Sequence, residues 1–168
     1  MVIQTIATIA TDHIDLVSSK SFEDTARDLA ALLGQSGTQD LMDRLAGAAD
    51  WDDYAAECDD LGGAGTLFQV GFLDWGGVLS LSGVPMKAQC FIIGNPVTAQ
   101  TLLAAGGPML GLYLPVKMLV YEARDGTAHI AYDQLPLMAP SENDGLSVVT
   151  SAIDAALKEL AWAAAGWL

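Results

Sequence analysis

Basic residues are scarce in this chain of 168 residues, which carries seven lysines and arginines against 21 aspartates and glutamates, a net charge of −14. The seven are scattered rather than clustered. Nucleic-acid binding needs grouped positive side chains that neutralise phosphates. We therefore expect no nucleic-acid partner and no anionic membrane partner, and we take the charge as favouring solubility.

Histidine and cysteine are also rare, with two of each. Cys58 and Cys90 have neither metal-site spacing nor the pattern of a disulfide framework, and Cys90 lies in an apolar run typical of a buried thiol. His13 and His129 belong to predicted strands and form no motif such as His-Glu-x-x-His with a carboxylate. The sequence therefore predicts no metal and no cofactor.

Long apolar segments are missing as well. No stretch reaches 18 apolar residues without a charge, a glycine or a proline, and no basic region precedes an apolar core at the N-terminus. We expect a cytoplasmic protein without a membrane-spanning helix. Hydrophobic residues make up 52% of the chain, which fits one domain over residues 1–168 with a sizeable core.

The N-terminal part alternates loosely over residues 3–9 and 12–19, which predicts one or two strands. At Ser21 the pattern changes. Ser21 and Asp24 form a capping-box arrangement, and apolar residues then recur at helical spacing until Gly34. A helix is expected here.

Residues 35–65 are strongly acidic and carry only short apolar repeats. One short helix is expected around Leu41 and another after Asp50, with Gly62–Gly65 as a flexible join. The acidic residues lack the alternating ligand spacing of an EF-hand loop and indicate a solvated helix face. We interpret the segment as a helical insertion outside the core.

Residues 66–133 predict an antiparallel sheet. "TLFQVGFLDW" has apolar groups on both faces, which favours a central, covered strand, and residues 78–82 and 88–93 favour further strands. Asp125-Gly126 between two alternating runs is typical of a hairpin. A helical stripe over 143–164 predicts a long helix across this sheet, so the fold class is α+β.

Gly94-Asn95-Pro96 lies between an apolar run and a predicted helix. Asparagine is a favoured N-cap, and proline suits the first helical position. These residues are explained as strand exit, cap and first turn. A second interpretation stays open, in which free amides at the helix start hold an anion, although no lysine or arginine lies nearby in sequence.

Four motifs resemble the bacterial domain-of-unknown-function family 302. They are "SFEDTARDLAALLGQSG", "TLFQVGFLDWGG", "FIIGNP" and "GLYLPVKMLVYEARDGTAHIAYDQLP", in the family's order. The resemblance implies a TATA-binding-protein-like α+β fold, with elements β-α-β(4)-α, often paired into a homodimer. It implies no activity. The chain departs from the pattern at Trp75, where many members have histidine after the aspartate, and at Val97-Thr98, where they have Gly-Thr.

Candidate site residues come from this family-like core. A curved sheet against a long helix can leave an apolar pocket, here expected to be lined by Phe68, Phe72, Trp75, Phe91 and Leu119. Core filling is the alternative for these side chains. The polar candidates, with simpler roles as turn caps or solvated ion pairs, are Asp74, Asn95, Lys117 and Tyr132.

No Gly-x-Ser-x-Gly elbow and no phosphate loop occurs in the sequence. We therefore favour a non-catalytic dimeric module that binds a small apolar ligand or a partner. An enzyme of unknown reaction is the alternative, and a solvent-accessible pocket above about 300 Å³ favours ligand binding.

A homodimer is expected because the apolar residues exceed what one modest core hides. Trp162, Trp167 and Leu168 continue past the helical stripe at the chain end. The alternative is that they fold back onto the N-terminal strands of the same chain.

Overall fold

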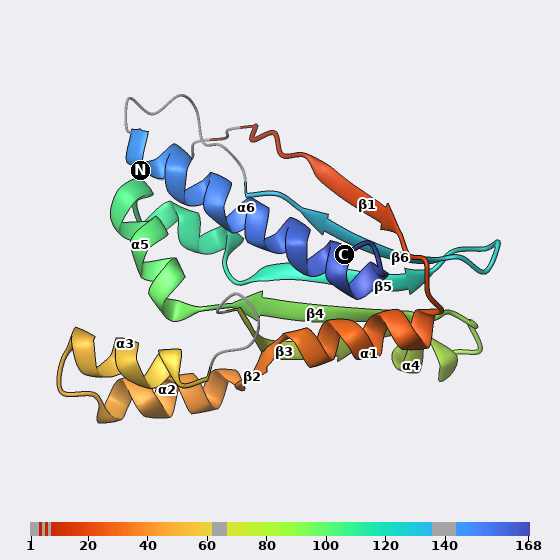
Figure 1. The fold of residues 1–168 in the computed structure, drawn as a ribbon, viewed down its shortest axis with the longest axis horizontal. Coiled ribbons are helices and arrows are strands. Elements are labelled where there is room, and N and C mark those ends of the chain that lie inside the picture. The colour runs from red at the N-terminus through yellow and green to blue at the C-terminus, as the bar shows by residue number, and fades with distance from the viewer. Residues whose placement is uncertain (1–3, 5, 7, 62–66, 136–143) are drawn as a thin grey trace.

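A six-stranded sheet with helices on one face forms the framework of the protein (Figure 1). It is seen in a computed structural model that describes residues 4, 6, 8–61, 67–135 and 144–168. The elements in chain order are β1 (His13–Val17), α1 (Phe22–Leu32), β2 (Gly34–Gln35), α2 (Thr38–Gly47), α3 (Trp51–Asp59), β3 (Phe68–Asp74), α4 (Trp75–Ser80), β4 (Ala88–Gly94), α5 (Pro96–Gly106), the 3-10 helix η2 (Pro108–Tyr113), β5 (Val116–Glu122), β6 (Ala128–Asp133) and α6 (Asp144–Ala165).

The strands lie in the order β1-β6-β5-β4-β3-β2, and every neighbouring pair is antiparallel except β2 with β3. Helices α1 and α6 pack side by side across the same face (Figure 1). The prediction of an α+β fold, with an antiparallel sheet and a long C-terminal helix across it, is confirmed. No described helix is long and apolar enough to cross a membrane.

The main core lies between this sheet face and the two helices. Alternating strand residues such as Val120 and Ile130 point into it, and α6 contributes Leu157 and Ala161, all fully buried. The inward-facing alternate residues of the strands and the apolar stripe of α6 therefore pack against each other in one interface.

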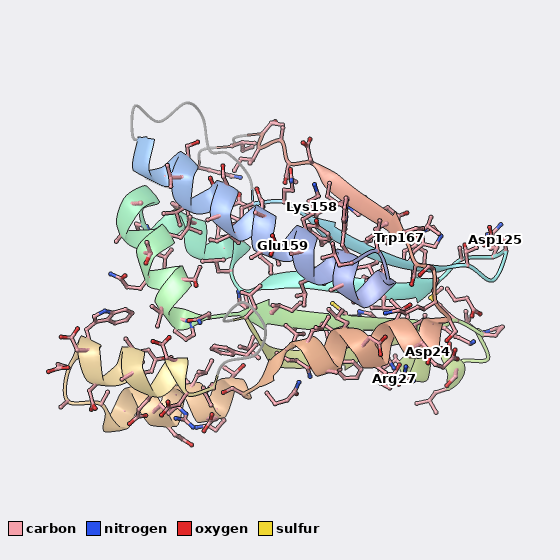
Figure 2. All side chains as sticks on the ribbon, in the orientation of Figure 1. Asp24, Arg27, Asp125, Lys158, Glu159 and Trp167 are labelled. Atoms are coloured by element: carbon pink, nitrogen blue, oxygen red, sulfur yellow. The ribbon has the colours of Figure 1, made fainter. Side chains whose placement is uncertain are left out.

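Helix α1 begins as predicted. The Ser21 hydroxyl accepts a hydrogen bond from the Asp24 amide at 3.1 Å, so Ser21 is the N-cap. The helix then buries Phe22, Ala26 and Leu29 on one face, and Asp24 and Arg27 lie on its outer side (Figure 2).

The predicted hairpin joins β5 to β6. Gly126 has a φ of +86°, which glycine adopts without strain, and the Ala123 amide donates to Thr127 O at 2.8 Å. The tip at Asp125 projects beyond the sheet (Figure 2).

Two strand predictions are wrong. Residues 78–82 do not form a strand, because the Asp74 carboxylate accepts from the Gly77 amide at 2.9 Å and starts α4 instead. Strand β3 is not central and covered, since its outer neighbour β2 has only two residues, and Phe72 and Leu73 are 43% and 40% exposed. Apolar residues on both faces of β3 therefore lie partly at the surface.

The N-terminal strand is shorter than predicted. Residues 13–17 form β1, whereas residues 4, 6 and 8–12 form no strand. The rest of 3–9, the Gly62–Gly65 join and Asn143 lie outside the described residues.

The acidic segment contains both expected helices, α2 and α3. Asp50 caps α3 by accepting from the Asp53 amide at 3.0 Å. The two helices share a small apolar cluster with β3, in which Leu41, Tyr54 and Cys58 cover Phe68. This cluster is separate from the main core.

The chain end folds back onto the N-terminal strand, as the alternative interpretation stated. Trp167 Nε1 donates to Val17 O at 2.8 Å, and the Ser19 amide donates to Ala165 O at 3.0 Å. Figure 2 shows Trp167 beside β1. Trp167 and Leu168 nevertheless remain 54% and 76% exposed.

Candidate functional site

An apolar pocket of about 350 Å³ lies beneath helix α5, in the size range of small-molecule sites. Several elements build it. Its lining comes from α2 (Thr38, Leu41), β3 and the residue before it (Leu67, Val70), β4 and α5 (Ile93, Gly94, Asn95, Pro96, Thr98, Ala99, Leu103), the η2–β5 region (Gly111, Leu114, Pro115, Val116) and α6 (Ile153, Leu157). Thr38, Gly111 and Pro115 are exposed, so the pocket reaches the surface.

The Gly94-Asn95-Pro96 stretch forms one wall. Asn95 is the N-cap of α5, because its Oδ1 accepts from the Val97 amide at 2.8 Å, and Pro96 is the first helical residue. At Gly94 an added Cβ would lie 3.2 Å from Pro115 Cβ, so glycine allows the close approach of these two segments. The predicted cap is confirmed, and the same residues shape the pocket.

The polar side chains of the lining are neutral. They are Thr38, Asn95 and Thr98, and no aspartate, glutamate, lysine, arginine, histidine, tyrosine or cysteine occurs among the described lining residues. General acid–base catalysis needs a titratable group within hydrogen-bond reach of the substrate. This lining offers apolar contact area and a few neutral hydrogen-bonding groups.

Part of the wall comes from the acidic segment. Thr38 and Leu41 of α2 face the pocket, and the Thr38 hydroxyl donates to Val70 O at 3.1 Å. Sequence reasoning missed these two residues because they lie more than 50 positions before α5. The available signal was the short apolar repeat that contains Leu41 within this acidic stretch.

Of the nine candidate site residues named from the sequence, Asn95 alone lines this pocket. Phe68 and Tyr132 are buried in the core, at 0% and 5% exposure. Burial, followed by the nearby charge of Asp154, raises the pKa of Tyr132. Lys117 is exposed on the sheet face opposite the main core, next in sequence to the pocket residue Val116.

The apolar side chains expected around a pocket are divided between the core and the surface. Phe72 packs edge-on against Phe91 with ring centroids 5.2 Å apart, and Phe91 is 2% exposed. Trp75 is 42% exposed in α4, and Leu119 is half-buried in β5. Asp74 caps α4, the simpler role considered for it. Core filling therefore describes Phe68 and Phe91, and surface exposure describes Trp75.

A second group of polar side chains lies where β1 meets β6. His129 Nδ1 is 2.9 Å from Asp15 Oδ1, the Tyr121 hydroxyl donates to Asp15 Oδ2 at 2.8 Å, and His13 Nδ1 is 2.7 Å from Asp133 Oδ1. Although burial raises the pKa of Asp15, the hydrogen bonds from Tyr121 and His129 outweigh it and lower that pKa. These contacts fasten the edge strand to the sheet.

This polar group is not arranged as a nucleophile and base. His129 Nε2 is 3.0 Å from Thr127 Oγ1, but the Thr127 hydroxyl donates to Asp125 Oδ1 at 2.6 Å. Among the residues that the structure describes, no three or more His, Cys, Asp or Glu side chains gather as metal ligands.

The chain is similar to one known family and to a solved structure of a member of that family. The model of the family described as "Domain of unknown function DUF302" matches residues 74–163. A crystal structure titled as an uncharacterized conserved protein DUF302 from Bacillus stearothermophilus is similar over 92% of this chain and 96% of that chain, with 16% sequence identity and a TM-score of 0.54. At that identity the likeness supports the fold alone. No curated protein matches the chain.

Proposed function

Since the chain belongs to the DUF302 family, for which these matches show a fold but no activity, we propose that it is a non-catalytic module binding a small apolar molecule in the pocket beneath α5. The proposal rests on the pocket itself, which has a volume of about 350 Å³, opens at the surface, and is lined by apolar side chains with three neutral polar ones. Such a lining favours binding by burial of apolar surface.

The alternative of an enzyme of unknown reaction has less support. A catalytic pocket ordinarily contains a titratable group whose pKa is set by its surroundings. Here the histidines pair with aspartates at the β1–β6 edge, and the described pocket lining carries no such group.

Blocking the pocket tests the proposal. Ala99 lies on α5 and faces the cavity, so Ala99→Phe places a ring in the space that the ligand needs. Ala152→Phe on α6 is the matched control, because Ala152 is exposed and outside the pocket lining. Nile red, a neutral dye that brightens in apolar surroundings, is titrated into each protein.

We expect the wild-type protein and Ala152→Phe to bind Nile red saturably with equal affinity, and Ala99→Phe to lose most of that binding. Thermal melting of all three proteins checks that they are folded. Equal binding by folded Ala99→Phe would refute the pocket as the site.

We also propose that the module is a homodimer formed through residues 75–86. This segment, "WGGVLSLSGVPM", has no charged residue in a chain of net charge −14. Val78, Leu81, Val84 and Met86 are 44–91% exposed. Exposed apolar area of this kind typically marks a partner surface, and two-fold pairing is the commonest assembly.

Sedimentation equilibrium at micromolar concentration tests the dimer, with a chain mass of 17.6 kDa. Leu81→Glu should shift the mass from two chains toward one. Leu112→Glu outside the segment and Leu168→Glu at the chain end, both at leucines that are 76% exposed, should leave it unchanged. A single-chain mass for the wild type excludes the dimer, and dissociation by Leu168→Glu alone moves the interface to the chain end.

We also propose a more specific fold type and a location in the cell. The order β1, α1, β3, β4, β5, β6, α6 agrees with a TATA-binding-protein-like arrangement, to which the remaining elements are additions. Location in the cytoplasm stays a prediction from the sequence.

A further inference from the structure

We infer that the ligand of this pocket is an uncharged, largely apolar molecule with one hydrogen-bond acceptor. The Thr98 hydroxyl donates a hydrogen bond to that acceptor. The inference rests on the proposed function and specifies the chemistry of the molecule that the pocket takes. It follows from two independent features of the lining, its lack of charge and the state of its hydroxyl groups.

An anion would find no counter-charge in the described lining. The basic side chain on the α2 wall, Arg44, lies one turn from Leu41 and is already engaged, with Nε 3.1 Å from Asp40 Oδ2 and Nη1 3.8 Å from Glu57 Oε2. Moving an ion from water into apolar surroundings without a partner is strongly unfavourable. The lining therefore selects against charged molecules.

The start of α5 does not replace that missing charge. Pro96 has no amide hydrogen, the Val97 amide is bound by Asn95 Oδ1 at 2.8 Å, and the Ala99 amide donates to Asn95 O at 2.9 Å. Of the first four helical positions, the Thr98 amide alone is left for a ligand. The interpretation of Gly94-Asn95-Pro96 as an anion site therefore keeps a single backbone donor, the Thr98 amide.

The hydroxyl of Thr98 differs from its neighbours. Thr101 and Thr150 donate to the carbonyl four residues earlier, at 3.2 and 3.0 Å, and Thr38 donates to Val70 O. Within the described residues, Thr98 Oγ1 makes no hydrogen bond. No described side-chain nitrogen or oxygen is both buried and unpartnered, so this unpartnered hydroxyl is not buried. Thr98 lines the pocket, and its accessible hydroxyl is free to donate to a bound molecule.

Three probes of one shape separate the features of the ligand. They are 2-acetylnaphthalene, which is neutral with a carbonyl acceptor, 2-naphthoate, which is anionic at pH 8, and 2-ethylnaphthalene, which lacks the acceptor. Each is titrated into the full-length protein and into Thr98→Val, which removes the hydroxyl at nearly constant shape. Binding is followed by amide chemical shifts, and thermal melting confirms the fold of the variant.

We expect wild type to bind 2-acetylnaphthalene at least about tenfold more tightly than 2-naphthoate, because the carboxylate loses hydration without a partner. Thr98→Val should weaken 2-acetylnaphthalene by about threefold to tenfold, the range of one neutral hydrogen bond, and leave 2-ethylnaphthalene unchanged.

The outcomes distinguish the inference from the proposed function. Tighter or equal binding of 2-naphthoate overturns the uncharged ligand while the binding module stands. Equal weakening of both neutral probes by Thr98→Val overturns the role of the hydroxyl. Failure of all three probes and of Nile red to bind the wild-type protein refutes the proposed function, and the inference falls with it.

Discussion

Two helical glycines should respond in opposite directions to the same substitution. Gly76 is buried in α4, and an added Cβ would lie 2.7 Å from Met86 O and 3.1 Å from the Ala88 amide nitrogen. Both neighbours are backbone atoms, one just before β4 and one in its first residue, so neither can rotate away. Gly47, the last residue of α2, has no atom within 4 Å of the position of a new Cβ.

The sizes of two opposing effects decide whether each variant is more or less stable than the wild-type protein. Replacing glycine by alanine in a helix stabilises by about 0.5–1 kcal/mol when the site has room. Overpacking costs about 1–3 kcal/mol. Gly47→Ala should therefore stabilise the protein by up to about 1 kcal/mol, whereas Gly76→Ala should destabilise it by about 0.5–2 kcal/mol.

Thermal melting measures the difference, at about 2–4 °C per kcal/mol for a chain of this size. Gly47→Ala should melt slightly above the wild-type protein and Gly76→Ala several degrees below it. If Gly76→Ala melts as high as Gly47→Ala, the close packing of α4 on β4 is wrong. The position of the exposed segment 75–86 would then be wrong as well, since Gly76 anchors it.

Three further predictions concern the cap of α1, the half-buried carboxyl of Asp154 and the acidic segment. Ser21→Ala should lower the free energy of unfolding by about 1 kcal/mol, because α1 loses the oxygen that accepts its third amide, and urea unfolding checks this. Burial raises the pKa of Asp154 above 3.8, partly offset by the hydrogen bond from the Leu135 amide. A raised carboxyl pKa means that stability falls as pH rises through the interval between 3.8 and the higher folded value. Asp154→Asn keeps the acceptor and should melt above the wild-type protein at pH 7, with the gap closing below about pH 4; an unchanged gap at low pH would show that ionisation is not the cause. A protein without residues 36–63 should still melt cooperatively, because the main core excludes α2 and α3. The same deletion should abolish Nile red binding, because it removes one wall of the pocket. A non-cooperative melt would show that the segment belongs to the core.

Local patterns predicted the elements whose stabilising contacts are themselves local. Ser21 and Asn95 were identified as caps because the groups that they bind lie two or three residues away. The Asp125-Gly126 hairpin followed from a turn that needs a positive φ. In each case neighbouring residues alone determine the geometry.

The two wrong strand predictions concern apolar residues whose burial depends on segments far away in the sequence. Val78 and Leu81 suggested a strand, but the cap at Asp74 started a helix that leaves both exposed. Phe72 and Leu73 suggested a covered strand, yet the two-residue β2 gives β3 almost no outer neighbour. The sequence shows which side chains are apolar, whereas the order of the strands in the sheet decides whether those side chains are buried.

The sequence by itself determined the fold class, the caps, the hairpin and the long helix, because propensity and periodicity act over a few residues. The pocket was decided by tertiary structure. Thr38, Thr98 and Leu157 lie on three different helices, 60 and 59 positions apart along the chain, and only the packing of those helices on the sheet brings the three residues together. A cavity is the space that packing leaves unfilled, so it has no signature in the order of the residues that surround it.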